Sequence, residues 1–361
     1  MRVVATPTSL ILIPIDFMPP KILPVGKLPL ELLEGLISQA PTQDPRLVLG
    51  PGIGLDCAVI DAGPTLMVYK SDPITFATDE IGWYAVQVNA NDIATSGAQP
   101  RWFLLTMLLP AGQTTEELVQ QISTQVYRAC RDLGITVIGG HTEITQGLER
   151  PILVGTMIGE VTREKLVTPR GAKPGDRILL TKGVPIEATA ILAREFPQRL
   201  AAHLSADEIH HAAQFLYNPG ISVVRDAGIA LQAGQVTAMH DPTEGGLASA
   251  LWELAQASNS CLVIDRRAVT IPALSQRICQ AFNLDPLAAI ASGALLLATP
   301  QVHAQPILKA LESEGIACAE IGSVEAGPAA VWQRSNAGRE LLPRPERDEI
   351  TKLFEGAEFY S

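Results

Sequence analysis

Hydrophobic and polar positions alternate along the first half of the chain with two periods, one helical and one strand-like. Apolar residues recur at i, i+3 and i+4 in several stretches, which is typical of helices with one buried face. Short apolar runs bounded by turn residues predict strands between them. Thr114, with Glu117 three residues later, has the spacing of a capping box. The predicted helices are 28–38, 79–96 and 114–133, and the predicted strands are 57–60, 66–70, 101–109, 135–138 and 152–161.

A segment rich in Pro, Gly and basic residues, 162–175, interrupts this pattern and predicts a linker. The alternation then resumes, with strands expected at 177–181, 236–239, 261–264, 294–298 and 318–321 and helices at 186–194, 221–230, 244–257, 273–282 and 305–313. This pattern favours two α/β domains. We expect an N-terminal extension and helix (1–40), an N-terminal domain (41–165), a C-terminal domain (172–335) and a C-terminal tail (336–361).

The first residues form an apolar stretch that makes a poor signal peptide, because Pro14 and Asp16 interrupt it and only Arg2 is basic. We expect Met18 to be the true start, or residues 1–17 to be a loose extension; an extra edge strand is the alternative. The sequence contains no run of about 18 apolar residues, so it predicts no membrane helix.

The charge balance narrows the classes of function. Lys and Arg number 27 and Asp and Glu 38, which gives a net charge of −11. This balance argues against a nucleic-acid-binding domain, since phosphates need a basic surface. A nucleotide can still bind if a cation bridges acidic side chains and phosphate. The five scattered cysteines form no C-x-x-C pair, so we expect a reducing, cytoplasmic location without disulfides or structural zinc.

A glycine-rich loop at residues 50–54 resembles a phosphate-binding loop, and Gly52 and Gly54 are candidate cofactor contacts. The loop is not a P-loop, since no Gly-Lys-Ser/Thr follows. It is also a poor dinucleotide fingerprint, because a strand rather than a helix comes next. The alternative is a turn that needs unusual backbone angles.

Three aspartates at or near the edges of predicted elements form a candidate magnesium site. Asp56 precedes a strand, Asp72 follows one, and Asp92 lies in an apolar helical stretch. Mg²⁺ takes oxygen ligands, usually one or two carboxylates with phosphate and water. Asn89 and Asn91 are polar where helix propensity is indifferent or adverse, and we take them as candidate cofactor contacts. Each aspartate, taken alone, could instead be an ordinary cap or turn residue.

The run Gly139-Gly140-His141-Thr142-Glu143 directly follows a predicted strand. Two glycines let a backbone approach a ligand, and α/β sheets bind ligands at the carboxyl ends of their strands. The candidate cofactor contacts here are Gly139, Gly140 and Thr142, and the candidate catalytic residues are His141 and Glu143. The alternative is a hydrogen-bonded turn.

The run Asp241-Pro242-Thr243-Glu244-Gly245-Gly246 predicts a capped helix start, with Asp241 as the N-cap. A glycine-rich helix N-terminus offers free N–H groups to an anion. The candidate cofactor contacts here are Thr243, Gly245 and Gly246, and the candidate catalytic residues are Asp241 and Glu244. The alternative is a well-capped helix without a ligand.

Together these segments resemble the superfamily of aminoimidazole ribonucleotide (AIR) synthetase, thiamine-monophosphate kinase, selenophosphate synthetase and the hydrogenase maturation protein HypE. The runs that carry the resemblance follow the family's order and are 54–59, 71–72, 91–100, 139–142 and 241–247. The run 91–100, with Asn91-Asp92 followed by Gly97-Ala98-Gln99-Pro100, is the most specific, and the run 241–247 looks most like HypE.

The resemblance implies a PurM-like two-domain fold. In this fold the N-terminal sheet forms a barrel across a homodimer, and the C-terminal α/β domain covers the site. The resemblance also implies ATP and Mg²⁺ as cofactors, with Asp56, Asp72 and Asp92 as the metal ligands. By the same resemblance, residues 139–142 would line the nucleotide or acceptor side.

The chain departs from the HypE pattern at four places. HypE ends in a cysteine that receives a carbamoyl group, whereas this sequence ends in Ser361 and has its last cysteine at Cys318. Ser292 stands where HypE has a glutamate, Glu244 where it has a basic residue, and Leu55 where the usual Asp-Asp pair has its first aspartate. We therefore expect any ATP-dependent activity to act on a free small molecule or on a partner's group, not on a thiol of this chain.

The leading hypothesis is a Mg-ATP-dependent enzyme of the HypE or AIR synthetase type. Such an enzyme activates an amide, carbamoyl or carboxyl oxygen, or phosphorylates a small molecule, with hydrogenase maturation as one context. The alternatives are a small-molecule kinase like thiamine-monophosphate kinase and a nucleotide-binding accessory protein that has lost the chemistry. The expected partners are a second copy of the chain and either a small-molecule acceptor or a maturation partner protein.

Overall fold

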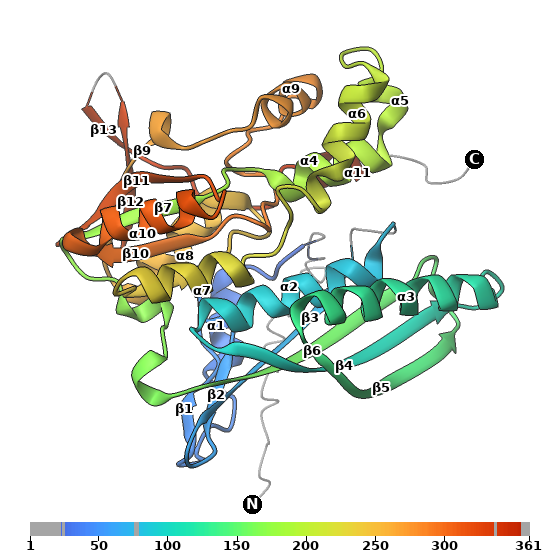
Figure 1. Ribbon diagram of the computed structural model, residues 1–361, viewed down its shortest axis with the longest axis horizontal. Coiled ribbons are helices and arrows are strands. Elements are labelled where there is room, and N and C mark those ends of the chain that lie inside the picture. The colour runs from blue at the N-terminus through green and yellow to red at the C-terminus, as the bar shows by residue number, and fades with distance from the viewer. Residues whose placement is uncertain (1–22, 24–25, 76–78, 336–337, 355–361) are drawn as a thin grey trace, which may run out of the picture.

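Two β-sheets, each packed against helices, make up the chain in the computed structural model (Figure 1). The structure describes residues 23, 26–75, 79–335 and 338–354. The extension 1–17 and the start at Met18 lie outside the described residues. The mixed α/β fold expected from the sequence is confirmed. None of the described helices is long and apolar enough to cross a membrane.

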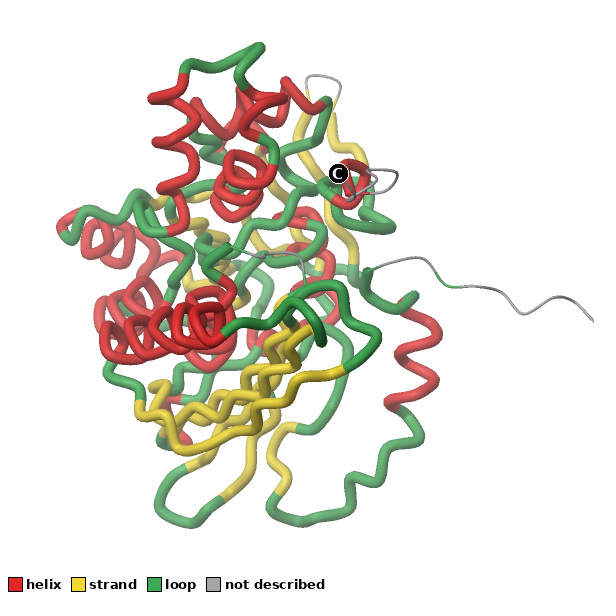
Figure 2. The backbone as a smooth tube through the Cα atoms, turned by 90° about the vertical axis from the view of Figure 1, so that its right-hand side faces the viewer, coloured by secondary structure: helices red, strands yellow, loops and turns green. Residues whose placement is uncertain are grey.

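The N-terminal sheet has six strands in the order β1-β2-β3-β6-β4-β5, and all neighbours are antiparallel except β4 and β5. Helices α2 (Ile81–Thr95) and α3 (Glu116–Leu133) lie on one side of this sheet in both views (Figures 1 and 2). The strands are β1 (Leu47–Leu49), β2 (Ala58–Asp61), β3 (Leu66–Ile74), β4 (Gln99–Pro110), β5 (Thr136–Thr145) and β6 (Ile152–Val161).

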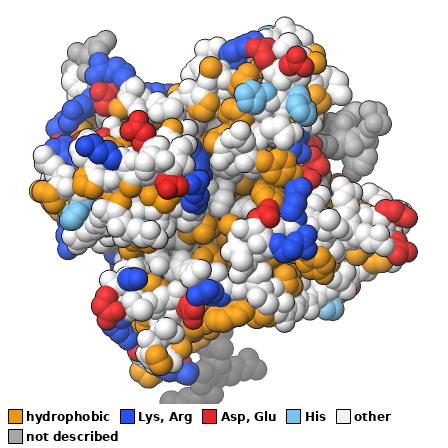
Figure 3. Space-filling view, viewed as in Figure 1, with side chains coloured by type: hydrophobic (Ala, Val, Ile, Leu, Met, Phe, Trp, Pro, Cys, Tyr) orange, Lys and Arg blue, Asp and Glu red, His pale blue; other side chains and the backbone are white. Residues whose placement is uncertain are grey.

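The described residues cover the other face of the N-terminal sheet only partly. Along β6, buried residues alternate with half-buried ones, as expected when only one face packs on helices. The half-buried positions are nonetheless largely apolar, and include Val154 and Ile158 on β6 and Met67 on β3. The edge strand β5 exposes Ile138 and Ile144 as well. Figure 3 shows hydrophobic side chains along the lower edge of the molecule, below this sheet.

The C-terminal sheet has seven strands in the order β13-β12-β9-β11-β7-β10-β8. One face packs on α8 (Gly246–Ser258), and the other packs on α7 (Val224–Ala233) and α10 (Gln301–Ser313). Leu179 and Leu180, neighbours on one strand, belong to these two different cores. The strands are β7 (Asp176–Thr181), β8 (Ala238–His240), β9 (Cys261–Asp265), β10 (Leu296–Pro300), β11 (Cys318–Glu325), β12 (Ala330–Ser335) and β13 (Gly338–Leu341).

The remaining described helices lie outside these layers. Helices α4 (Ile186–Glu195) and α9 (Ala273–Phe282) contribute to the same core as α2, which joins the two halves of the chain. The short helices are α1 (Leu30–Ile37), α5 (Pro197–Leu200), α6 (Ala206–Ala213) and α11 (Thr351–Phe354).

Helix α2 is buried on almost every side, because it lies between the N-terminal sheet, α3 and the C-terminal half. This position explains why the apolar helix contains the polar residues Asn89 and Asn91, since each of them bonds to backbone groups of neighbouring segments. The amide of Asn91 donates to the carbonyl of Ile221 at 2.8 Å and accepts from the N–H of Val223 at 2.8 Å. Asn91 therefore joins the two domains, and a contact of its amide with a cofactor stays a prediction.

Asn89 has a similar structural role within the N-terminal half. Its side-chain oxygen accepts from the N–H of Asp72 at 3.0 Å, and its nitrogen donates to the carbonyl of Ala85 at 2.9 Å. The side chain is fully buried, and both of its polar ends have backbone partners. Asn89 thus fixes β3 against α2, and the cofactor contact expected of it stays a prediction.

Most predicted elements are present, with shifted ends. Strand β5 continues to Thr145, so the Gly-Gly-His-Thr-Glu run lies inside a strand and not after one. Helix α3 is capped by Thr115, whose side chain accepts from the N–H of Leu118, while the Thr114 hydroxyl donates to the Pro110 carbonyl. Strand β13 and helix α11 lie in the segment set apart as a tail.

We expect Asn91→Ala to destabilise the protein without any ligand present. The substitution leaves a buried carbonyl at Ile221 and a buried N–H at Val223 without partners, which costs about 2–4 kcal/mol in total. Denaturant unfolding followed by circular dichroism measures the free energy of unfolding. An unchanged value would contradict the structural role of Asn91.

Candidate functional site

Four aspartates from distant segments gather where β3, α2 and the turn after β8 meet. They are Asp56, Asp72, Asp92 and Asp241, and the carboxylates of the other three lie close enough to Asp92 to add to the effect of burial in raising its pKa. Positions 66, 68, 70, 72 and 74 alternate with their neighbours along β3, so Lys70 and Asp72 share the face that meets α2. The three aspartates of the predicted magnesium site therefore do lie together, and Asp241 joins them.

Lys70 lies between two of these aspartates. Its ammonium nitrogen is 3.1 Å from Oδ2 of Asp72 and 3.1 Å from Oδ2 of Asp92. Burial disfavours the charged amine, but Asp92, Asp56 and Asp72 outweigh this effect and raise the pKa of Lys70 well above its usual value. The side chain is 12% exposed, so the ammonium is held inside the cluster as a permanent cation.

His240 forms a second cationic bridge in the cluster. Its Nε2 is 2.8 Å from Oε2 of Glu253 on α8, and its Nδ1 is 3.0 Å from Oδ2 of Asp56. Burial alone would lower the pKa of His240, but Asp56 and Glu253 raise it well above its usual value. Lys27 adds a contact of 3.6 Å to Glu253 from the N-terminal side.

Asp241 differs from the other three aspartates because it forms no ion pair with a described cation, although the charges of His240 and Lys70 favour its ionised form. The residue is 1% exposed, and neither side-chain oxygen has a hydrogen-bond partner among the described residues. Burial and the nearby Asp56 carboxylate raise the pKa of Asp241 to about 6. Helix α8 begins at Gly246, so Asp241 is not the N-cap that the sequence predicted. A buried carboxylate without partners is costly, which makes Asp241 the strongest candidate for binding a ligand.

The residues present fit a divalent cation. Asp56, His240 and Asp241 each offer a ligand atom, and these atoms all lie within 4.8 Å of one another. Both nitrogens of His240 already face carboxylates, which leaves the oxygens of Asp56 and Asp241 as the available donors. Carboxylate oxygens are the ligands that Mg²⁺ prefers. Burial raises the pKa of Asp92, and the carboxylates of Asp241, Asp56 and Asp72 add to this effect. A cation there would also relieve the repulsion between these carboxylates.

The glycine-rich loop brings Asp56 to this cluster. Gly54 has φ of 69°, and a Cβ at this position would lie 2.8 Å from the carbonyl oxygen of Glu253. At Gly52 a Cβ would lie 2.6 Å from the side chain of Leu55. The close approach of the loop to α8 explains why position 54 is glycine. A phosphate contact by Gly52 or Gly54 remains a prediction.

The start of α8 is already occupied by protein contacts. The N–H of Gly245 donates to Oδ2 of Asp348 at 2.6 Å, and the N–H of Gly246 donates to the carbonyl of Thr243 at 2.9 Å. A Cβ at Gly246 would lie 2.5 Å from the carbonyl oxygen of Ala289. These contacts already use the N–H groups of Gly245 and Gly246, and Asp348 fixes the turn that carries Asp241. Contacts of the two glycines with a cofactor remain predictions.

Glu244 lies in the same turn and is partly exposed. Burial raises its pKa, against the effect of Lys27. The structure therefore places Glu244 on the rim of the aspartate cluster, next to Thr243, which is also partly exposed. Catalytic and cofactor roles for these two residues remain predictions.

The other candidate catalytic pair lies on β5. Nε2 of His141 is 3.2 Å from Oε2 of Glu143, and both side chains are largely exposed, as is Thr142. A Cβ at Gly140 would lie 1.9 Å from the carbonyl oxygen of Leu105, so this glycine is required for the pairing of β5 with β4. The structure keeps His141 and Glu143 on an edge strand, apart from the turn that carries Asp241 and Glu244.

A buried glutamate lies beside Ser292, the position where the HypE pattern has its own glutamate. Oε2 of Glu187, in the first turn of α4, accepts from the N–H of Ser292 at 3.2 Å. Burial raises the pKa of Glu187 to about 7. No local pattern in the sequence pairs these positions, because 105 residues separate them.

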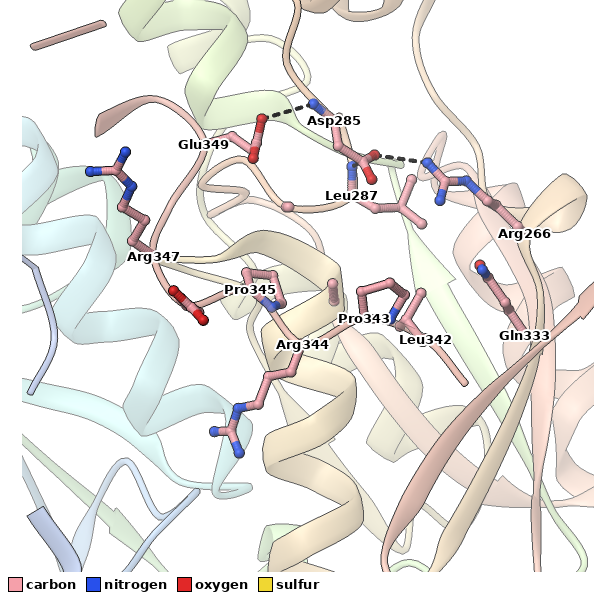
Figure 4. A pocket seen from close by; sticks show the side chains of 13 residues that line it. Arg266, Asp285, Leu287, Gln333, Leu342, Pro343, Arg344, Pro345, Arg347 and Glu349 are labelled. Atoms are coloured by element: carbon pink, nitrogen blue, oxygen red, sulfur yellow. Dashed lines mark hydrogen bonds and ion pairs between the residues drawn. The ribbon is translucent and has the colours of Figure 1, made fainter. Parts of the chain in front are cut away.

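A cavity of about 370 Å³ lies elsewhere, between α8 and the C-terminal segment. In Figure 4 the Asp285 side chain pairs with Arg266, and the side chain of Glu349 accepts from the backbone of Asp285. None of the four aspartates lines this cavity. Its lining residues are Ala248, Arg266, Asp285, Leu287, Ala288, Gln333, Leu342, Pro343, Arg344, Pro345, Glu346, Arg347 and Glu349.

Family models match most of the chain. The N-terminal domain of the AIR synthase related proteins matches residues 54–161, and the C-terminal domain matches residues 173–333. The chain therefore belongs to the AIR synthase related family. The four aspartates and Lys70 all lie within these two matched ranges.

Curated relatives include proteins of hydrogenase maturation. A Methanocaldococcus jannaschii protein, provisionally named a hydrogenase expression/formation protein, is 29% identical over 313 residues, which cover 84% of this chain and 90% of its own. Carbamoyl dehydratase HypE of Cupriavidus necator is 28% identical over 275 residues, 74% of each chain.

Solved structures of HypE share the fold. HypE in complex with ATP superposes with a TM-score of 0.66 at 24% identity and covers 87% of this chain and 90% of its own. The structure of a HypE–HypF complex matches with a TM-score of 0.70 at 18% identity, covering 88% of this chain and 100% of the other. At these identities the likeness concerns the fold.

We expect Glu187→Gln to stabilise the protein in a pH-dependent way. The folded state raises the pKa of Glu187 to about 7. The neutral carboxyl is therefore favoured by folding, and its contribution, complete below about pH 4.5, is lost as pH rises through 7, by at most about 3 kcal/mol. The glutamine variant should be more stable than the wild type at pH 8 and equal to it near pH 5.

Denaturant unfolding of both proteins at each pH measures this difference. Glu312→Gln, a change at an exposed position, is the matched control and should behave as the wild type throughout. A stability difference that does not vary between pH 5 and pH 8 would contradict a titrating Glu187.

Proposed function

We propose that this chain is a Mg-ATP-dependent enzyme of the HypE type. It would use ATP to activate a carbamoyl, amide or carboxyl oxygen by phosphorylation, or would phosphorylate a small molecule. Membership of the AIR synthase related family and the curated HypE relatives support this reaction class. The relatives named for hydrogenase maturation favour that context, with a maturation protein as the partner.

The observation that carries the proposal is the unpaired carboxylate of Asp241. It lies buried beside Asp56, and its two oxygens have no partner within the described part of the chain. A triphosphate cannot approach this acidic cluster unless a cation intervenes. Mg²⁺ held by Asp56 and Asp241 would give the Asp241 oxygens a partner and would also let the triphosphate approach the cluster.

The chain's own residues would bind and orient the reactants. Bound Mg-ATP supplies the phosphoryl group, and phosphoryl transfer mainly requires positioning and charge neutralisation from the protein. Asp56 and Asp241 would hold the metal, while Lys70 and His240 balance the remaining carboxylates. Asp348 keeps the Asp241 turn in place through the N–H of Gly245.

The thiols of the chain are unsuited to accept a carbamoyl group. Four of the five cysteines are buried, and Cys318 is partly buried. Burial raises the pKa of Cys130, Cys279 and Cys318 to about 12, so the reactive thiolate is scarce at neutral pH. The acceptor would therefore be a free small molecule or a group on a partner protein.

We expect ATP binding that depends on Mg²⁺ and on Asp241. Calorimetric titration should give tight binding with Mg²⁺ and at least about tenfold weaker binding with EDTA, because the triphosphate then meets uncompensated carboxylates. Asp241→Asn should weaken Mg-ATP binding by a similar factor. Asp132→Asn, an exposed change on α3, is the control and should bind as the wild type. Equal ATP affinity with and without Mg²⁺ would contradict the proposal.

ATP turnover separates an enzyme from an accessory protein. The purified wild type, assayed with Mg²⁺ and candidate acceptors such as carbamoyl phosphate, should release ADP, the product of phosphoryl transfer from ATP, and Asp241→Asn should not. Mg-ATP binding without turnover under every acceptor would favour the nucleotide-binding accessory protein.

A second copy of this chain would cover the open face of the N-terminal sheet. The half-buried apolar positions on β3 and β6 and the exposed Ile138 and Ile144 on β5 support such a contact. An uncovered apolar sheet face and an unpaired edge strand are unfavourable in a monomer. We therefore keep the homodimer, with its barrel between the two sheets, as part of the proposal.

We expect light scattering to give about twice the chain mass of 38.5 kDa at micromolar concentration. Ile158→Lys, which places a charge on the open face, should reduce this to about one chain mass, since burying a lysine between two sheets is unfavourable. Val302→Lys, at a 77% exposed position on α10, should remain a dimer. A wild type of one chain mass would contradict the homodimer.

A further inference from the structure

Lys70 occupies a place in the aspartate cluster that a cation from solution would otherwise take. Its ammonium nitrogen contacts one oxygen of Asp72 and one of Asp92, each at 3.1 Å. Two carboxylates held around one point are a typical arrangement for binding a divalent ion. Here the point is filled by a side chain of the protein itself.

The charges of the cluster agree with this arrangement. The carboxylates of Asp56, Asp72, Asp92, Asp241 and Glu253 face three cationic side chains, Lys27, Lys70 and His240. With all five acids ionised, two negative charges remain, which is the charge that one divalent ion neutralises. Both side-chain oxygens of Asp241 lack a hydrogen-bond partner among the described residues, and its carboxylate lies within 4.8 Å of ligand atoms of Asp56 and His240 and forms no ion pair with Lys70.

We propose that Lys70 is a built-in cation that excludes a divalent ion from the position between Asp72 and Asp92. A divalent ion is thereby confined to the side of Asp56 and Asp241. This inference rests on the proposed Mg-ATP function and assigns Asp72 a role different from that of a metal ligand. Lys70 is a positioning residue, because it acts by fixing two carboxylates.

The geometry keeps Lys70 in this position. The residue lies inside β3, where it pairs with Met157 of β6, directly after the stretch of β3 that also pairs with β2, so its backbone is fixed. Its side chain is 12% exposed, and that of Asp92 is 3% exposed. The Asp72 N–H is fixed in turn by the amide of Asn89. Moving the ammonium out would leave the buried Asp92 carboxylate unpaired, which is unfavourable unless another cation replaces it.

The test counts metal ions bound by the nucleotide-free protein. Mn²⁺ is the probe, and electron paramagnetic resonance measures the free ion during titration. The wild type should bind about one ion per chain, and Lys70→Met should bind about one more, since the neutral side chain frees two carboxylates. Lys70→Arg, which keeps the charge, and Lys309→Met, at an exposed position on α10, should both bind as the wild type.

A second substitution locates the added ion. Asp72→Asn in the Lys70→Met background should remove it, whereas Asp72→Asn alone should leave the wild-type count unchanged. If Lys70→Met folds only with metal, Mn²⁺ should raise its melting temperature by several degrees more than that of the wild type, which supports the proposal equally. An unchanged ion count and melting response in Lys70→Met would overturn it.

The ion count in Lys70→Met tests the inference about Lys70 independently of the proposed Mg-ATP function. A chain that gains the added ion in Lys70→Met but binds no Mg-ATP would retain the inference about Lys70 and lose the proposed function. A chain that binds Mg-ATP but gains no ion in Lys70→Met would lose only the inference.

Discussion

The convergence of four aspartates at one buried place is the constraint on which the rest of the site depends. Carboxylates so close together repel one another, and burial strengthens the repulsion because the surroundings screen it poorly. The chain balances most of this charge with its own cations, Lys70 and His240. Asp241 is the exception, because neither of its side-chain oxygens has a hydrogen-bond partner among the described residues. These oxygens are the basis for proposing a metal ion and a nucleotide at this site.

Contacts between the two domains bring the four aspartates together. Asn91 joins α2 to the segment before α7, and Gly54 allows the Asp56 loop to reach α8. Asp348, near the end of the described chain, fixes the turn that carries Asp241. Each contact crosses a long distance in the sequence, so the aspartates meet only when both domains and the C-terminal segment are in place.

The site keeps the carboxylates of the family resemblance and changes what surrounds them. Lys70 brings a fixed positive charge into the cluster, and Glu187 places a carboxyl beside Ser292 from another helix. The buried cysteines have thiols of raised pKa, where a HypE cycle would need a reactive one. These differences favour a shared use of Mg-ATP with a different acceptor.

The sequence by itself determined the class of fold, most helices and strands, and the three aspartates Asp56, Asp72 and Asp92 as neighbours. Periodicity and motif order are local properties, and the chain displays them directly. Tertiary structure alone decided the roles of the polar residues around them. The sequence shows Asn91 only as a polar residue in an apolar helix, because its two backbone partners lie 130 and 132 residues away. The pairing of Lys70 with Asp92 was equally hidden, because it depends on how α2 packs on β3 and not on any local pattern.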